Sequence, residues 1–126
     1  HGITVNSFTS VSLDPPLILI AIGHASRAIQ HFRGAKGFGL NVLREDQQRL
    51  SEHFARKGHT RFEGVEWYPG ETGVPLIPGV LAVIECARVK TVTAGDHDIF
   101  IAETTRAQVS EGRPLLYFGG AYHGVK

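Results

Sequence analysis

The sequence has a single cysteine and almost no net charge, and each scarcity excludes a class of protein. Cys86 cannot form a disulfide within the chain, which favours a reducing, cytoplasmic setting. The formal net charge of +1 provides no field that could hold nucleic acid or an anionic membrane non-specifically. We therefore expect no nucleic-acid partner, and a charged ligand must be recognised by a local cluster.

Long apolar runs are also absent, and no charged-then-apolar leader is present, so we expect no membrane association. At 126 residues, of which 42% are hydrophobic, the chain has the size of one domain over residues 1–126. It contains no methionine, and residue 1 already stands at the start of a strand-like run. We expect that an N-terminal piece is missing.

Nucleotide-phosphate, metal and nucleophile motifs are lacking too. The stretch GFGLNV (37–42) begins like a dinucleotide fingerprint but has no third glycine and leads into a strand. The seven histidines show no metal-binding spacing and are interpreted as surface or hydrogen-bonded residues. Cys86 lies in an apolar strand-like run and is predicted to be a core residue.

The sequence does contain strong β patterns. Residues 17–22, LILIAI, form a continuous apolar run, typical of a central strand buried on both faces. The other predicted strands are residues 38–43, two long runs joined at AGDH (94–97) and two short runs joined at GG (119–120). Adjacent strands of this kind favour antiparallel hairpins. The expected architecture is mainly β, an antiparallel barrel with peripheral helices.

Two segments have helical spacing. One covers residues 24–33 and ends at Gly34, and the other covers residues 45–58, where Leu50 and Phe54 stack at i and i+4. Residues 60–79 are predicted to be an ordered but irregular excursion.

The opening stretch HGITVNSFTSVSLDPP is a strand-like run with hydrogen-bonding side chains on both faces. It ends at Pro15 and Pro16, which are expected to direct the backbone away from regular pairing. Such a segment can bind a planar molecule with a polar edge, and a flavin ring is one candidate. An edge strand solvated on its outer face is the alternative.

Positive charge gathers just after the apolar run at residues 17–22, on Arg27, Arg33 and Lys36, with Ser26 and His31 among them. An arginine fork, a hydroxyl and a helix N-terminus together could bind a phosphate. A solvated helix face would explain the same charges taken alone.

Six segments, in order along essentially the whole chain, resemble the flavin reductase-like family. They are HGITVNSFTSVSLDPPLILIAIG, FGLNVLREDQQRLSEHFA, RFEGVEW, GVPLIPGVLAVIEC, AGDHDIFIAE and RPLLYFGGAYH. The resemblance implies an FMN-binding split β-barrel, antiparallel and Greek-key-like, with two or three peripheral helices. It also implies a homodimer and an NAD(P)H:flavin oxidoreductase activity that supplies reduced FMN or FAD to a separate monooxygenase.

Matched by position, the resemblance implies which residues bind the ligands. Those along the flavin ring and ribityl chain are Thr4, Val5, Asn6, Ser7 and Phe8. Those on the phosphate side are Ala25, Ser26 and Arg27, with His31 and Phe32 nearby, and Asn41 also lies close to the flavin. Those that border the nicotinamide are Ser10, Val11, Tyr122 and His123. His97 is the candidate catalytic residue, with a simple turn histidine as the alternative.

The sequence departs from the family in two places. Family members carry an additional helix and strand upstream of His1, which we expect to be missing here. Arg44 stands where the family often has a serine helix cap, and Asp46 could cap instead.

Hydride transfer between stacked nicotinamide and flavin rings needs separations of about 3–3.5 Å and no covalent catalyst. Backbone amides near residues 7–10 are the expected donors to the ring edge. A non-catalytic flavin-binding or electron-carrier protein is the alternative function, and a barrel without flavin is a weaker one. The choices between FMN and FAD, and between NADH and NADPH, stay open.

Overall fold

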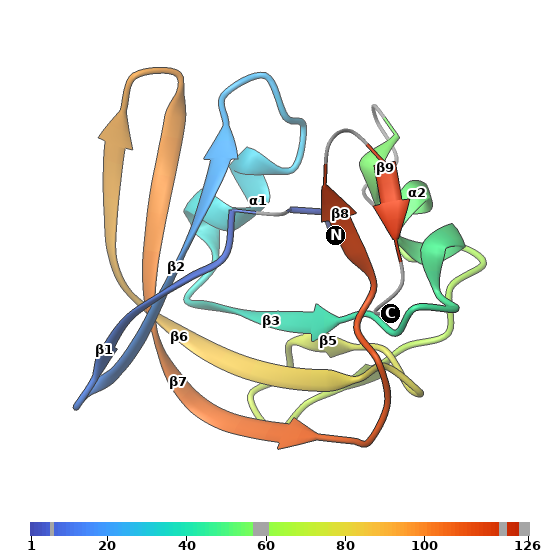
Figure 1. Ribbon diagram of the computed structural model, residues 1–126. Helices are drawn as coiled ribbons and strands as arrows, with labels where there is room; N and C mark the ends of the chain where they lie inside the picture. Colours follow the sequence, from blue (N-terminus) through green and yellow to red (C-terminus); the bar gives the residue numbers. More distant parts are fainter. Residues whose placement is uncertain (6, 57–60, 119–120, 124–126) are drawn as a thin grey trace.

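A five-stranded antiparallel sheet forms most of the fold, as the computed structural model shows (Figure 1). The structure describes residues 1–5, 7–56, 61–118 and 121–123. The sheet contains β1 (Thr9–Leu13), β2 (Pro16–Gly23), β7 (His97–Val109), β6 (Ala82–Ala94) and β3 (Gly37–Val42), in that spatial order. The smaller pairs are β4 (Tyr68–Pro69) with β5 (Pro75–Leu76) and β8 (Leu116–Phe118) with β9 (Ala121–His123). The predicted mainly β, antiparallel architecture is confirmed.

The long hairpin of β6 and β7 bends strongly across the molecule (Figure 1). Its register shifts between Glu85 and Cys86 and again between Arg88 and Lys90. Such irregularities increase local bending and twist. One half of the hairpin therefore pairs with β2 and the other half pairs with β3, as predicted for strands long enough to bend around a sheet.

The main hydrophobic core lies on one side of this sheet. It contains Ile18, Ile20, Ile22, Ile29, Phe38, Cys86, Phe100 and Ala102. Phe100 is 0% exposed, and Cys86 is a core residue as predicted. The prediction that β2 is buried on both faces is wrong, because only its alternate residues are buried. The core covers one face, so Leu17 and Leu19 on the other are half-buried.

The described residues before Thr9, which are 1–5, 7 and 8, are not in a strand, contrary to prediction. Ser7 explains the difference, because its hydroxyl donates to the carbonyl oxygen of Ala21 (2.9 Å) and accepts from the Ala21 amide (3.0 Å). A side chain thus takes the place of a ladder partner. The two prolines do not prevent pairing either, since Pro16 pairs with Leu13 across a turn that contains a cis Asp14–Pro15 bond.

Both helices are shorter than predicted. The first, α1, covers Ile29–Gly34, and the second, α2, covers Gln48–Ala55. The N-cap of α2 is Gln47, which makes no side-chain capping bond, so the expected cap by Asp46 is wrong. The Gln47 side chain instead accepts from the Arg44 amide (2.8 Å).

The C-terminal hairpin reaches α2 through backbone bonds to the chain between β3 and α2. Glu45 donates to the Arg113 carbonyl (2.9 Å), and Leu115 donates to the Leu43 carbonyl (3.0 Å). These bonds bring β8 and β9 next to α2 (Figure 1).

The carboxylate of Asp98, which is 2% exposed, joins α1 to the sheet. His24 Nε2 lies 2.8 Å and Thr93 Oγ1 3.1 Å from its Oδ1, and Arg33 Nε donates to its Oδ2 (2.8 Å). The Arg33 guanidinium, aided by His24 and Thr93, lowers the pKa of Asp98 to about 2.

A second buried carboxylate, Glu85, is 3% exposed and lies at the other end of the sheet. The amide and the hydroxyl of Thr72 donate to its Oε1 over 2.9 and 2.7 Å. These two bonds lower the pKa of Glu85. Gly70 packs so closely that a methyl group there would lie 2.5 Å from Glu85 Oε1.

We expect Asp98 to make the free energy of unfolding depend on acidic pH. Its folded-state pKa of about 2 lies below the value of about 3.9 for an unfolded aspartate. Its contribution is therefore complete above the unfolded pKa and is lost as the pH falls through the folded-state pKa. Urea unfolding between about pH 6 and about pH 2 measures this loss. Asp98→Asn should flatten the slope below about pH 4, and an unchanged slope would contradict the assignment.

Gly70→Ala should reduce the free energy of unfolding by about 1–3 kcal/mol, the usual cost of overpacking. The added methyl group would collide with the carboxylate of Glu85. The matched control is Gly34→Ala, because a methyl group at Gly34 meets no atom within 4 Å. We expect the control to change stability by no more than about 0.5 kcal/mol. Equal losses from both variants, measured by urea unfolding, would contradict the close approach.

Candidate functional site

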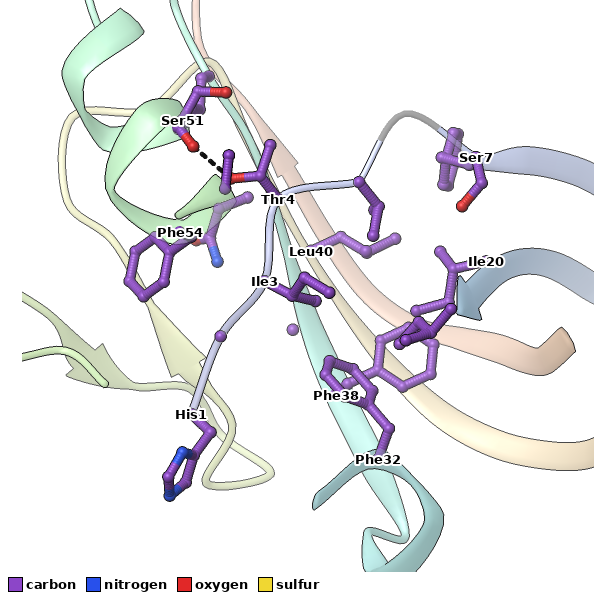
Figure 2. A pocket seen from close by; sticks show the side chains of 18 of the residues that line it. His1, Ile3, Thr4, Ser7, Ile20, Phe32, Phe38, Leu40, Ser51 and Phe54 are labelled. Atoms are coloured by element: carbon purple, nitrogen blue, oxygen red, sulfur yellow. Dashed lines mark hydrogen bonds between the residues drawn. The ribbon is translucent and has the colours of Figure 1, made fainter. Parts of the chain in front are cut away.

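A cavity of about 1030 Å³ lies between β2, β3, the two helices and the β8–β9 hairpin (Figure 2). Its described lining is largely apolar, with neutral polar groups and histidines. None of these lining residues is Asp, Glu, Lys or Arg. A cavity of this kind suits an uncharged planar ligand with a few polar edge atoms.

Residues 1–5 and 7–8 run along one wall of the cavity (Figure 2). Thr4 anchors them to α2, because its hydroxyl donates to the Ser51 carbonyl (2.6 Å) and its amide to the Phe54 carbonyl (3.4 Å). Ser7 anchors them to β2 through Ala21. Both hydroxyls are therefore already bonded to backbone groups.

The backbone of this wall makes few bonds to the rest of the described chain. Within the described part of residues 1–8, Thr4 is the one residue whose amide donates to a described backbone carbonyl outside the regular strands. Val5 and Phe8 line the cavity, and their amides have no such partner among the described residues. Backbone donors of this kind must find a partner when they are buried, and a bound ligand can supply it.

The wall formed by α1 presents His31 and Phe32. The Phe32 ring lies against Phe38 and Phe100, with centroid distances of 5.8 and 5.9 Å. The His31 ring stacks on His1 at 3.5 Å. Both α1 residues named by the family resemblance thus line the cavity.

Strand β3 forms the floor of the cavity. Gly39 and Asn41 fix the distance between this strand and residues 75–77. A methyl group at Gly39 would lie 2.8 Å from the Pro75 carbonyl, so only glycine allows this approach. Asn41 accepts from the Ile77 amide (2.9 Å) through Oδ1 and donates to Pro75 through Nδ2 (3.5 Å). Asn41 lines the cavity, but the amide group of its side chain is bonded to residues 75–77.

The wall opposite α1 comes from α2 and the C-terminal hairpin. Ser51 Oγ lies 2.9 Å from the hydroxyl of Tyr122, and the Tyr122 ring meets Tyr117 edge-on at 5.2 Å. Tyr122 was predicted, whereas Ser51, Phe54 and Tyr117 were not. The apolar face of α2, with Leu50 and Phe54 at i and i+4, was the available signal for this wall.

His97 lies at the start of β7 and lines the cavity next to Gly23. Its Nδ1 lies 2.7 Å from Asp96 Oδ1, and this bond lowers the pKa of Asp96. A methyl group at Gly23 would lie 3.5 Å from His97 Nε2, so Nε2 faces the β2 wall.

The other described residues of the predicted site are not among those that line the cavity. Ser10 and Val11 lie exposed on β1, and His123 is exposed on β9. Ala25, Ser26 and Arg27 share the turn before α1, where the Ser26 hydroxyl accepts from the Ala28 amide (3.2 Å). Asn6 lies outside the described residues.

Other kinds of site have no support in the described part of the chain. No group of three or more His, Cys, Asp or Glu side chains there could hold a metal ion. None of the described helices is long and apolar enough to cross a membrane. Burial raises the pKa of the Cys86 thiol to about 11, which disfavours the nucleophilic thiolate.

These features fit a flavin. The largely apolar cavity matches its ring, the opening segment with Val5 and Phe8 carries backbone donors along one wall, and Arg27 lies exposed in the turn that precedes α1. A phosphate would be better placed at that turn than inside a cavity lined without cations.

Comparisons with known proteins agree with this fit. The sequence model described as "Flavin reductase like domain" matches residues 1–126. The FMN reductase (NADH) SmoA of Agrobacterium fabrum is 46% identical over 121 residues, which cover 96% of this chain and 69% of that protein. The reductase component of the flavin-dependent trigonelline monooxygenase of Acinetobacter baylyi is 40% identical over 121 residues. That match covers 96% of this chain and 39% of the relative, so the chain spans much less than the full length of some relatives.

A solved structure shows the same fold. The NADH:FAD oxidoreductase SgcE6 of Streptomyces globisporus, in complex with NAD and FAD fragments, superposes with a TM-score of 0.90 at 38% identity. The superposition covers 96% of this chain and 74% of that one. The predicted split-barrel fold class is thereby confirmed, although the five-stranded sheet does not close on itself in the described residues. The match over all of residues 1–126 shows that the chain belongs to the flavin reductase-like domain family.

Proposed function

We propose that this chain is an NADH-dependent flavin reductase that supplies reduced FMN or FAD to a separate monooxygenase. Its relatives include an FMN reductase (NADH) and the reductase component of a trigonelline monooxygenase. The observation that carries the proposal is the cavity lined without Asp, Glu, Lys or Arg, walled on one side by the opening segment with Val5 and Phe8. The cavity can hold the flavin and nicotinamide rings in a stack, and hydride transfer between them requires no nucleophilic side chain.

The residues of the chain contribute position and electrostatics. When bound, the flavin supplies the redox chemistry by accepting a hydride from the nicotinamide. The amides of Val5 and Phe8 donate to a ring edge, where they favour the negative charge that develops on reduction. Thr4 and Ser7 hold these amides in place through their own bonds to Ser51 and Ala21. The aromatic wall at Phe32 excludes water from the ring.

The two ends of the site have different tasks in this proposal. Ser26 and Arg27 bind the flavin phosphate, and His31 lies between them and the ring. His97 borders the nicotinamide at the Gly23 wall, with Tyr122 on the opposite side of the cavity. The carboxylate of Asp96 accepts a hydrogen bond from His97 Nδ1, so Nδ1 carries the proton of the neutral imidazole ring. Nε2, which faces the β2 wall of the cavity, is then the acceptor.

The proposal includes a homodimer in the cytoplasm. Exposed apolar side chains support an interface between copies, since Leu13 at the end of β1 is 94% exposed and Val109 at the end of β7 is 75% exposed.

The purified chain should oxidise NADH when FMN or FAD is added. Absorbance at the NADH band, followed with both flavins and with NADPH in place of NADH, measures the activity and the preference. Quenching of flavin fluorescence is measured in parallel, because it reports binding separately from turnover. Binding without turnover would favour a flavin carrier, and neither binding nor turnover would reject a flavin protein.

Arg27→Ala should weaken FMN binding by about 1–3 kcal/mol, the range for a charge-assisted contact. Riboflavin has the same ring and no phosphate, so its affinity should not change. Fluorescence titration gives both dissociation constants. Lys90→Ala removes an exposed cation from β6, outside the cavity lining, and serves as the control. An unchanged FMN affinity in Arg27→Ala would remove Arg27 from the site.

A further inference from the structure

The buried carboxylate of Asp98 connects three separate parts of the cavity wall. Its partner His24 directly follows Gly23, its partner Arg33 directly follows Phe32, and Asp98 itself directly follows His97. Gly23, Phe32 and His97 all line the cavity, whereas Asp98 does not. One carboxylate therefore fixes the end of β2, the last turn of α1 and the start of β7 relative to one another.

The helix α1 depends on such external support. It has six residues, and its N-cap, Ala28, makes no side-chain capping bond. A helix this short is not stable alone. Ile29 and Phe32 pack into the core, but apolar packing is not directional. The bond from Arg33 Nε to Asp98 is directional and charge-assisted, and Arg88 adds a bond to the Arg33 carbonyl (2.6 Å).

Stability alone does not explain a carboxylate in this place. A buried carboxylate in an ion pair contributes little net stability compared with well-packed apolar side chains, because it loses its hydration, while the Arg33 side chain stays 41% exposed. Its distinctive effect is geometric, since three donors from different elements converge on the two oxygens of Asp98.

We propose that Asp98 is a positioning residue for flavin reduction, which holds Gly23, Phe32 and His97 at the separation that ring stacking requires. This inference rests on the proposed reductase function. Asp98 acts through its neighbours and does not touch the ligands. Transfer between stacked rings needs a separation of about 3–3.5 Å, and a misplacement of about 1 Å can cost a factor of about 100 in rate.

The test is Asp98→Asn, which keeps the size of the side chain and removes its charge. We expect kcat for NADH oxidation to fall by about 10-fold to about 100-fold, while the dissociation constant for FMN changes by less than about threefold. The amides of Val5 and Phe8 and the turn at Arg27 are not bonded to Asp98, so flavin affinity should persist. A loss confined to flavin affinity, or an unchanged kcat, would overturn the proposal.

The kcat values of Arg33 variants provide a second readout, which a purely structural role of Asp98 would leave unchanged. Arg33→Lys keeps the cation beside Asp98 and should recover most of the kcat that Arg33→Gln loses. If Asp98→Asn fails to fold, the proposal is tested with the two Arg33 variants and with Thr93→Val. The Thr93→Val variant removes one hydrogen-bond donor from Asp98. Equal kcat values in Arg33→Lys, Arg33→Gln and the unchanged protein would reject positioning by this carboxylate.

The matched control is Glu85→Gln, which changes the other buried carboxylate. Glu85 does not line the cavity, and its partner Thr72 lies outside the cavity lining. The control should lower the melting temperature but leave kcat unchanged. If Glu85→Gln lost as much kcat as Asp98→Asn, the effect would be general destabilisation. Absence of turnover in the unchanged protein would reject the reductase function itself, whereas normal turnover in every variant would reject only the role of Asp98.

Discussion

Two hydroxyl groups hold the opening segment of the chain against its cavity, and the rest of the site depends on them. Ser7 replaces a strand partner of Ala21, and Thr4 bonds the Ser51 carbonyl on α2 (Figure 2). Had this segment joined the sheet as an ordinary strand, its amides would be used in the ladder. Held by side chains instead, the segment keeps Val5 and Phe8 in the cavity wall and outside the ladder. The largely apolar cavity that suits a flavin ring follows from this arrangement.

Two buried carboxylates support the sheet at opposite ends, with different consequences for the site. Asp98 collects donors from the residue after β2, from α1 and from β6, and both β2 and α1 line the cavity. Glu85 is bonded by Thr72 in the 70–72 turn, where Gly70 leaves no room for a methyl group. Both carboxylates are satisfied by hydrogen bonds, as buried charges must be. Only Asp98 lies where a small shift would alter the cavity.

Much of the fold could be predicted because it depends on local patterns. The long runs joined at residues 94–97 form one hairpin, and the run at residues 17–22 is a strand. Element ends were less accurate: the N-cap of α2 is Gln47 and not Asp46, and the Gln47 side chain accepts from the Arg44 amide instead of capping the helix. At the site, residues on α1 and in the opening segment were named from the sequence. Ser51, Phe54 and Tyr117 were missed, because their nearness to the opening segment depends on how α2 and the C-terminal hairpin pack.

The sequence by itself determined the strand content, the turns and the family. Hydrophobic periodicity predicts the strands, the positions of glycine and proline predict the turns, and six segments in order indicate the family. Each of these signals can be read along the chain without knowledge of distant contacts. Only the tertiary structure decided how the polar groups are used. Thr4, Ser7 and Asn41 were named as ligand contacts, and their side chains bond backbone groups of distant elements. Arg33 was assigned to a positive cluster and instead pairs with Asp98, 65 residues away in sequence. The physical reason is that a hydrogen bond depends on distance and direction in space, which the spacing of residues along a chain does not specify.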